Sequence, residues 1–229
     1  MIGQTPLYFN SMSAKSKRDL LIGAGKKTAA QRKEIKHNPE QEFQDSVYTQ
    51  EKGDTLLCFP ASGVKQAMAT AALETGGITK SSVQRLIFLP QSHINIWGKP
   101  YLKMDVVRSA DMNKTPDIRT RAFLPEWCAE VEIRYVVPTL NAVSIMTLLA
   151  NAGIICGIGD NRQEKGKGGY GTWTAYSAEE MGEFQDIWDE ITKEGRDVQE
   201  MAMQQPICFD QNTADQMKHL QEERVRRAA

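Results

Sequence analysis

The middle of the chain places the strongest constraint on the fold. Apolar and polar residues alternate over 94–97, 102–107 and 127–137, and no helical pattern separates these segments. Such alternation is typical of strands with one buried face. Neighbouring parallel strands need a long crossover, usually a helix, whereas antiparallel strands follow one another through short turns. We therefore expect an antiparallel sheet rather than a parallel, doubly wound one.

Helical and strand patterns before and after this middle complete an α+β order. Ser13 caps a helix that ends near Ile22, and Pro60 separates a buried strand from an alanine-rich helix. The order predicts a ferredoxin-like (RRM-like) antiparallel sheet with an inserted β-hairpin and C-terminal helices. The expected strands lie at 1–10, 55–59, 86–89, 94–97, 102–107, 127–137 and 172–176, and the expected helices at 13–22, 61–73, 81–86 and 141–152.

Composition predicts one core with appendages. We expect residues 1–176 to form the core, with a mobile basic loop at 23–46 and the inserted hairpin at 94–138. Charged helical patterns in 177–229 predict a peripheral helical extension. The residues expected to face the core from the helix at 141–152 are Val143, Met146, Leu149 and Ala150.

Several classes of site are not supported by the residue types present. The four cysteines are far apart without a C-x-x-C pair, and with only three histidines we expect reduced thiols, no metal site and no cofactor. Catalytic motifs such as H-E-x-x-H and G-x-S-x-G do not occur, so no catalytic residue is predicted. No apolar run is long enough to cross a bilayer, and the N-terminus has no signal-peptide pattern. We therefore expect a cytoplasmic protein without a membrane partner.

Residues 157–171 carry the clearest binding pattern. Six glycines interleave with Arg162, Lys165 and Lys167 in this segment. Glycines let the backbone approach a ligand closely, and the cations attract phosphate. The segment precedes a strand and lacks the G-x-x-x-x-G-K-[ST] spacing, so it is not a P-loop. The alternative is a flexible hairpin connection.

Other cations lie outside this segment. Residues 108–122 are net positive and are expected to form a long loop or a projecting hairpin. The alternatives are a salt-bridged surface hairpin there and solvated lysines elsewhere. Because the formal net charge is -1, the basic residues must gather on one face if the chain binds nucleic acid. The candidate nucleic-acid-binding residues are Lys26, Lys27, Lys65, Arg108, Lys114, Arg119, Arg121, Arg162, Lys165, Lys167 and Tyr170.

Three segments resemble the RAMP superfamily, the RRM-derived RNA-binding subunits of CRISPR effector complexes. Residues 59–68 resemble its strand-to-helix element, with Gln66 where glycine is common. Residues 157–173 resemble its glycine-rich loop, and residues 2–7 resemble the first strand of its backbone-type subunits. The whole pattern also resembles small bacteriophage proteins with the same arrangement of motifs.

The resemblance implies a palm-like RRM sheet and sequence-independent contacts to RNA or single-stranded DNA. It also implies head-to-tail assembly along the strand, as a homo-oligomeric filament or a multi-subunit ribonucleoprotein. It places Lys65, Arg162 and Lys165 near the nucleic-acid backbone and the hairpin at 108–122 between bases. Fold alone does not fix function, so these implications are expectations by analogy.

Binding of single-stranded RNA or DNA through backbone phosphates is the function that these patterns predict. Tyr170 and Trp173 are expected either to stack on bases or to pack within the sheet. One alternative is a phage structural or inhibitory protein that engages a protein partner, which the near-zero net charge and the acidic helices after Glu179 favour. Another is a nuclease that uses Asp111 or Asp160.

Overall fold

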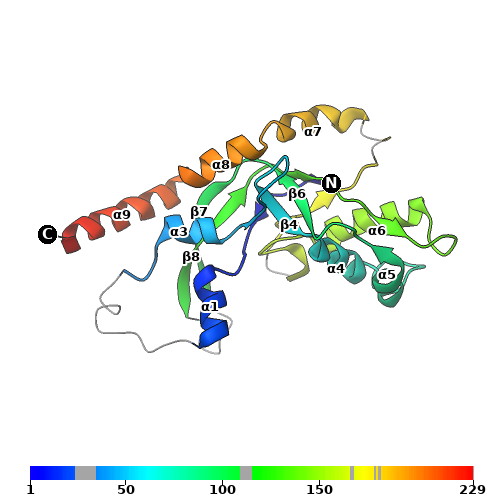
Figure 1. Cartoon of the computed structure of the whole chain (residues 1–229), viewed down its shortest axis with the longest axis horizontal. Coiled ribbons are helices and arrows are strands. Elements are labelled where there is room, and N and C mark those ends of the chain that lie inside the picture. The colour runs from blue at the N-terminus through cyan, green and yellow to red at the C-terminus, as the bar shows by residue number, and fades with distance from the viewer. Residues whose placement is uncertain (24–34, 109–114, 166–167, 178, 180–181, 229) are drawn as a thin grey trace. The chain divides into compact units, whose positions relative to one another are not determined.

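The protein is an α+β structure with antiparallel strands, as the sequence predicts (Figure 1). The computed structural model describes residues 1–23, 35–108, 115–165, 168–177, 179 and 182–228. The chain forms two compact units. Unit 1 comprises Met1–Tyr8, Tyr48–Pro100 and Leu124–Met201, and unit 2 comprises Phe9–Val47, Tyr101–Phe123 and Ala202–Ala229.

Unit 1 is built on a six-stranded sheet in the order β11-β1-β9-β6-β4-β3, in which each neighbouring pair is antiparallel. The register pairs Cys128 with both Ile2 and Trp97, so these three side chains share one face of the sheet. The strands are β1 (Ile2–Gly3), β3 (Tyr48–Thr49), β4 (Leu57–Pro60), β6 (His93–Trp97), β9 (Cys128–Ala129) and β11 (Trp173–Thr174).

Two long helices cover one face of this sheet. They are α4 (Ala61–Ala71) and α6 (Ala142–Ile155), which pack against each other, with α5 (Lys80–Leu86) beside α4 (Figure 1). A Cβ atom on Gly153 of α6 would lie 2.1 Å from the carbonyl oxygen of Trp173, so helix and strand meet backbone to backbone. The indole Nε1 of Trp173 donates to the carbonyl of Leu149 at 3.2 Å, which satisfies a polar group inside the core.

The helix α6 buries a different face from the one predicted. Ile145, Leu148 and Ala152 are buried together with Leu149, whereas Val143 is 76% exposed. The prediction failed because apolar residues surround most of the helix, so its periodicity does not select one face. The helix also continues past Gly153 to Ile155 instead of ending at that glycine.

The segment 127–137 is not one strand. The chain leaves the large sheet after β9, and Arg134–Tyr135 form β10, which pairs with β5 (Ile87–Phe88) in a separate two-stranded sheet. Of the expected strand, only Cys128–Ala129 and Arg134–Tyr135 are strand residues, and the residue pattern does not show which partner strand each pair takes.

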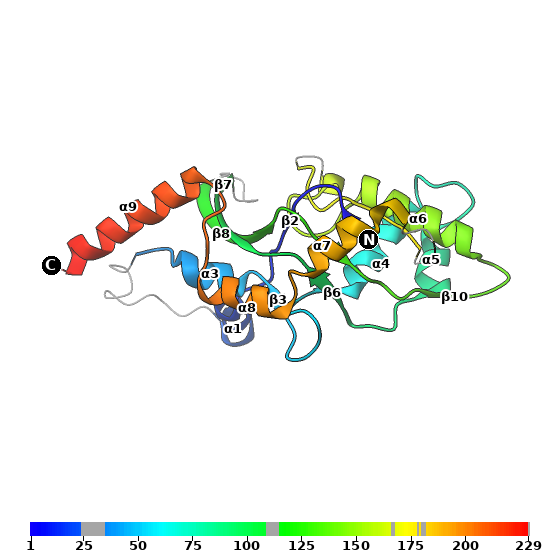
Figure 2. The same ribbon diagram turned by 90° about the horizontal axis from the view of Figure 1, so that it is seen from above.

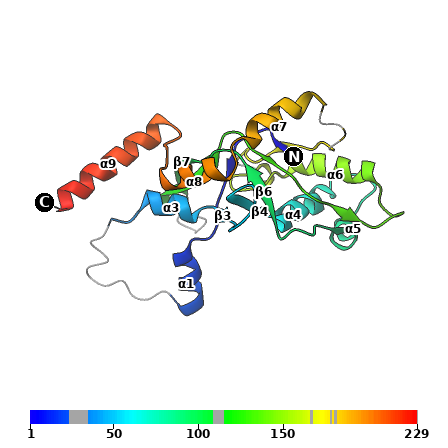
Figure 3. The ribbon, with the colours of Figure 1, turned by 45° about the horizontal axis from the view of Figure 1, so that its top comes forward.

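The opposite face of the large sheet is covered by α7 (Gln185–Thr192). Ile191 packs on Ile2, Trp97 and Cys128, and the Trp188 and Trp97 ring centroids lie 5.7 Å apart. Figure 3 shows α7 and α4 on opposite sides of β6. Unit 1 therefore has helices on both faces of its sheet.

The helix α8 (Arg196–Gln204) carries a fully buried glutamine, Gln199. Its Nε2 donates to the carbonyls of Ile96 and Gly98 at 2.8 and 3.0 Å. Its Oε1 accepts from the backbone N–H groups of Leu56 and Leu57, both at 2.9 Å. The side chain thus satisfies backbone groups next to β4 and β6, and this part of the segment expected to be peripheral lies in the core.

Unit 2 is a long β-hairpin with helices. The strands β7 (Tyr101–Arg108) and β8 (Pro116–Leu124) form the hairpin, which is shorter than the expected 94–138 because β6 and β9 belong to the large sheet, and residues 116–122 are strand rather than loop. The helix α9 (Gln211–Ala228) packs on β7, where Thr213 Oγ1 accepts from the Met104 N–H (Figure 2). Ser13 caps α1 (Ala14–Ile22) as predicted.

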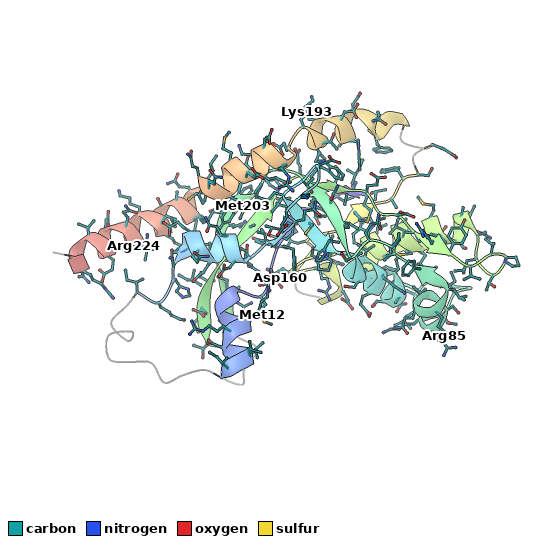
Figure 4. All side chains as sticks on the ribbon, in the orientation of Figure 1. Met12, Arg85, Asp160, Lys193, Met203 and Arg224 are labelled. Atoms are coloured by element: carbon teal, nitrogen blue, oxygen red, sulfur yellow. The ribbon has the colours of Figure 1, made fainter. Side chains whose placement is uncertain are left out.

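The segment 23–46 is not a loop throughout. Residues Pro39–Asp45 form the helix α3, which buries Phe43. Arg224 of α9 holds the start of α3 through its ion pair with Glu40 at 3.1 Å, and the pKa of that carboxyl is lowered by its hydrogen bonds to Arg224 (Figure 4). Residues 24–34 lie outside the described part of the chain.

We expect Gln199→Ala to lower the free energy of unfolding by about 2–4 kcal/mol, because it leaves buried backbone donors and acceptors without partners. Urea unfolding followed by tryptophan fluorescence measures this change. Gln204→Ala, at an exposed position of the same helix, is the matched control and is expected to change stability by less than about 0.5 kcal/mol. Equal stability of the two variants would contradict the role given to Gln199.

Three cysteines are buried free thiols, as expected, and Cys208 is half-buried. Burial raises the pKa of Cys128 from 9.0 to about 12 and that of Cys58 to about 11. The unfolded thiols ionise above pH 9 while the folded ones stay protonated, so this contribution to stability is complete below pH 9 and falls as pH rises toward 12.

We therefore expect the free energy of unfolding to decline above pH 9, and the decline to be smaller in Cys128→Ala. Urea unfolding at several values between pH 8 and 11 measures both slopes. Cys208→Ala is the control, because its thiol is less buried. Identical slopes for the wild type and Cys128→Ala would show that this thiol ionises equally in both states.

Candidate functional site

The segment 157–171 is fixed by backbone contacts that only glycine allows. Gly159 has φ +84°, and a Cβ atom there would lie 2.4 Å from the carbonyl oxygen of Tyr8. Gly171 has φ +69°, and a Cβ atom there would lie 1.8 Å from the carbonyl oxygen of Ile158. A side chain at either position would therefore meet both an unfavourable φ and a backbone oxygen that cannot rotate away.

Three backbone hydrogen bonds hold this segment to itself and to the start of the chain. The N–H of Asp160 donates to Tyr8 at 3.0 Å, and that of Gly171 donates to Pro6 at 2.8 Å. The N–H of Ile158 donates to Gly171 at 2.9 Å, which closes the segment. Asn161, at the tip between Asp160 and Arg162, takes a left-handed φ of 52°. These bonds fix the course of the described residues at both ends of the glycine-rich segment.

Two of the segments singled out in the sequence, 59–68 and 157–173, meet at a small cavity of about 80 Å³. One wall comes from the end of β4 and the start of α4, and the other comes from the glycine-rich segment. The lining residues are Phe59, Gly63, Gln66, Ala67, Gly157, Ile158, Gly159, Arg162 and Glu164. Residues almost one hundred positions apart in the sequence therefore form one surface.

Arg162 is the cation at this cavity. Its Nε donates to Glu164 Oε2 at 2.8 Å, and its Nη1 donates to the carbonyl of Gly159 at 3.3 Å. These contacts hold a half-buried guanidinium at the cavity, where its remaining N–H groups can donate to an anion. Glu164 competes with any anionic ligand for the same charge.

The other sequence-predicted binding residues do not line this cavity among the described side chains. Lys65 is half-buried on α4, one residue before the lining residue Gln66. Tyr170 packs edge-on against Tyr8, with ring centroids 4.8 Å apart. Lys165 lies in the short 3-10 helix Gln163–Lys165, but its side chain is outside the described part of the chain. Lys26, Lys27, Lys114 and Lys167, and with them Asp111, also lie outside the described residues.

The hairpin of unit 2 does not present its arginines as one patch. Arg121 is only 2% exposed and donates to Asp105 at 3.1 Å, so its guanidinium is held within the hairpin and not presented at the surface. Arg108 and Arg119 are exposed. The register pairs Arg119 with Asp105 and Arg108 with Pro116, which places the two arginines on opposite faces of the hairpin.

Trp173 is fully buried, which leaves packing within the sheet as its role. Sequence patterns missed another set of aromatic residues at the β3–β4–β6 side of the sheet. Ring centroids of Tyr48 and Phe59 lie 5.9 Å apart, and those of Tyr48 and His93 lie 6.5 Å apart. Only strand pairing brings these residues together, so no local pattern could have identified the set.

An acidic or metal site has no support among the residues that the structure describes. No group of three His, Cys, Asp or Glu side chains there is placed to hold a metal ion. Asp160, labelled in Figure 4, caps its own turn, because its Oδ1 accepts from the Asn161 N–H at 2.9 Å.

Among the described residues, no helix combines the length and the apolar character that crossing a bilayer requires.

Comparisons with known proteins add no further constraint. No family model, no curated protein and no solved structure matches the chain. The residues of the site therefore have to indicate which ligand it binds. A cation held at a glycine-rich rim is suited to binding an anion that reaches the backbone closely, and phosphate is such an anion.

We expect Gly171→Ala to lower the free energy of unfolding by about 3 kcal/mol or more, since it combines the φ penalty with overlap on the Ile158 oxygen. Gly77→Ala is the matched control. Gly77 has φ +85° but nothing within 4 Å of a Cβ atom, so only the φ penalty of about 1–2 kcal/mol applies. Chemical unfolding measures both, and an equal loss in the two variants would contradict the close packing at Gly171.

Proposed function

We propose that the chain binds single-stranded nucleic acid through its backbone phosphates at the cavity where 59–67 meets 157–164. The observation that carries this proposal is the convergence of the two segments on Arg162. Glycine in both walls brings backbone close to the rim, which suits a ligand with a repeating anionic backbone. Lys65, Lys165 and Lys167 are proposed to extend the contact along the strand.

The strand order supports a ferredoxin-like core as the finer description of unit 1. If β1, β6, β9 and β11 are numbered 1 to 4 in chain order, they lie across the sheet in the order 4-1-3-2. The helix α4 lies between β1 and β6 in the chain, and α6 lies between β9 and β11. This order supports the βαββαβ arrangement of that fold, with β4 and β3 added at the β6 edge.

The mode of binding differs from that of a typical RRM. An RRM stacks bases on the aromatic residues of an open sheet face. Here α7 covers that face through Trp188 and Ile191. We therefore propose that the nucleic-acid strand binds at the edge of the sheet beside the glycine-rich segment and not on a face of the sheet.

The RAMP resemblance extends the proposal to assembly. A backbone-type subunit repeats along the nucleic acid, so a homo-oligomer or a ribonucleoprotein, phage-encoded and acting in the cytoplasm, is the setting that we propose. Two observations support this setting. The segments 2–7, 59–68 and 157–173 follow one another in the family's order, and they contact one another in unit 1. Complexes that grow stepwise with oligonucleotide length in size-exclusion chromatography would support assembly along the strand.

Binding to a protein partner is the second candidate function. Phe88 of β5, Val137 after β10 and Val143 of α6 are 58%, 69% and 76% exposed. Exposed apolar residues of this size often lie in protein interfaces when they form a patch. The formal net charge of -1 also favours a protein ligand over a polyanion. Failure of every nucleic-acid ligand in the experiment below would favour this alternative.

We expect Arg162→Gln to weaken binding of a fluorescent 20-nucleotide RNA or DNA severalfold in anisotropy titrations at low salt. The slope of log affinity against log salt should become shallower by roughly 0.7, the contribution of one phosphate contact to a single strand. Arg85→Gln is the control for loss of one charge, because Arg85 is exposed on α5, apart from Asp160 and the glycine-rich segment (Figure 4).

Glu164→Gln should have the opposite effect. Removing the carboxylate that pairs with Arg162 frees the guanidinium for phosphate, so binding should strengthen while the fold is kept. Circular dichroism of each variant checks that the fold is kept. Unchanged affinity in both Arg162→Gln and Glu164→Gln would overturn the proposed site.

A further inference from the structure

We infer that bases of the bound strand stack on an aromatic edge formed by Tyr48, Phe59 and His93, next to the phosphate site at Arg162. This inference rests on the proposed function and goes beyond phosphate binding. It assigns a base-contacting surface to residues that carry no charge pattern in the sequence, and it predicts that the ligand is a strand with unpaired bases.

The three residues come together through the pairing of β3, β4 and β6. Tyr48 pairs with Cys58 and His93 pairs with Pro60, which are the residues on either side of Phe59 in β4, so the two lie on the strands next to it. The Tyr48 and Phe59 rings are nearly perpendicular, at 79°, and Tyr48 and His93 are tilted by 45°. The set is therefore a connected aromatic surface and not three separate side chains.

The aromatic edge differs in burial from the aromatic residues of the core. His93 is exposed, and Tyr48 and Phe59 are half-buried, whereas Trp127 and Trp173 are fully buried. A ring that is packed only for stability is normally enclosed, because burial is the source of its stabilising free energy. Parts of these three rings remain accessible to a ligand.

Phe59 connects the aromatic edge to the phosphate site. Its ring lies against Gly63, where a Cβ atom would approach Phe59 Cε1 to 2.6 Å. Phe59 and Arg162 line the same cavity. A nucleotide whose phosphate contacts Arg162 would thus have its base beside Phe59, and the next base would lie toward Tyr48 and His93.

Stacking on protein aromatics requires an unpaired base. In a duplex the faces of the bases are occupied by their neighbours, whereas in a single strand they are accessible. Stacking tolerates any base, because every base has a π face. The aromatic edge therefore favours single strands over duplexes without selecting a sequence.

Abasic oligonucleotides separate stacking from phosphate binding. The experiment compares the affinity of the full chain for oligothymidylate and for an abasic deoxyribose-phosphate strand of the same length, with oligouridylate as the RNA arm. The wild type is expected to bind the base-bearing strand roughly tenfold more tightly, which is the size of one to two stacking contacts.

The variants assign this preference to residues. Tyr48→Leu and Phe59→Leu should each reduce the tenfold preference toward equality, and Tyr48→Leu, which lies outside the cavity lining, should leave the abasic affinity unchanged. Arg162→Gln should weaken both ligands by the same factor. Phe88→Leu, which removes an exposed aromatic ring on β5, is the control and should leave the preference intact.

The outcomes distinguish the inference from the proposed function. If the wild type binds neither ligand, the proposed function is wrong and the inference with it. If the wild type binds both ligands equally, phosphate binding stands and stacking is overturned. If Tyr48→Leu weakens both ligands equally, Tyr48 only supports the fold, and stacking is again overturned.

Discussion

The contact of backbone on backbone at Gly159 and Gly171 is the constraint on which the site depends. The carbonyls of Tyr8 and Ile158 occupy the space that a side chain would need at these positions. Because residues 157–171 pack this closely on the backbone at these two positions, Arg162 reaches the cavity beside the start of α4. Glycines usually allow the backbone many conformations. Here the close contacts at these glycines hold the backbone in one conformation.

The packing of unit 1 decides which of its surfaces face a ligand. One sheet face is covered by α4 and α6, and the other by α7 through Ile191 and Trp188. Gln199 of α8 then binds the backbone next to β4 and β6. The proposed binding surface lies at the rim, where the glycine-rich segment and the aromatic edge meet, and this position distinguishes the protein from an RRM with an open face.

Local patterns predicted the elements well and their partners poorly. The Ser13 cap, the helix after Pro60 and the alternation of β7 are local signals, and each is found as predicted. The burial of Arg121 depends on a cross-strand partner sixteen residues away, Asp105, and the aromatic edge depends on three paired strands. The face of α6 was missed because apolar residues lie on most of its sides. The two glycine-containing segments were identified from the sequence, but their meeting at one cavity is a tertiary contact that no local pattern specifies.

Photo-crosslinking of a short oligonucleotide that contains 4-thiouridine, followed by peptide mass spectrometry, tests the central claim most directly. The account predicts that the nucleic acid crosslinks to peptides from both walls of the cavity, 59–67 and 157–164, and to Tyr48 or His93. Crosslinks confined to the hairpin at 101–124 or to α9, with neither wall labelled, would contradict it.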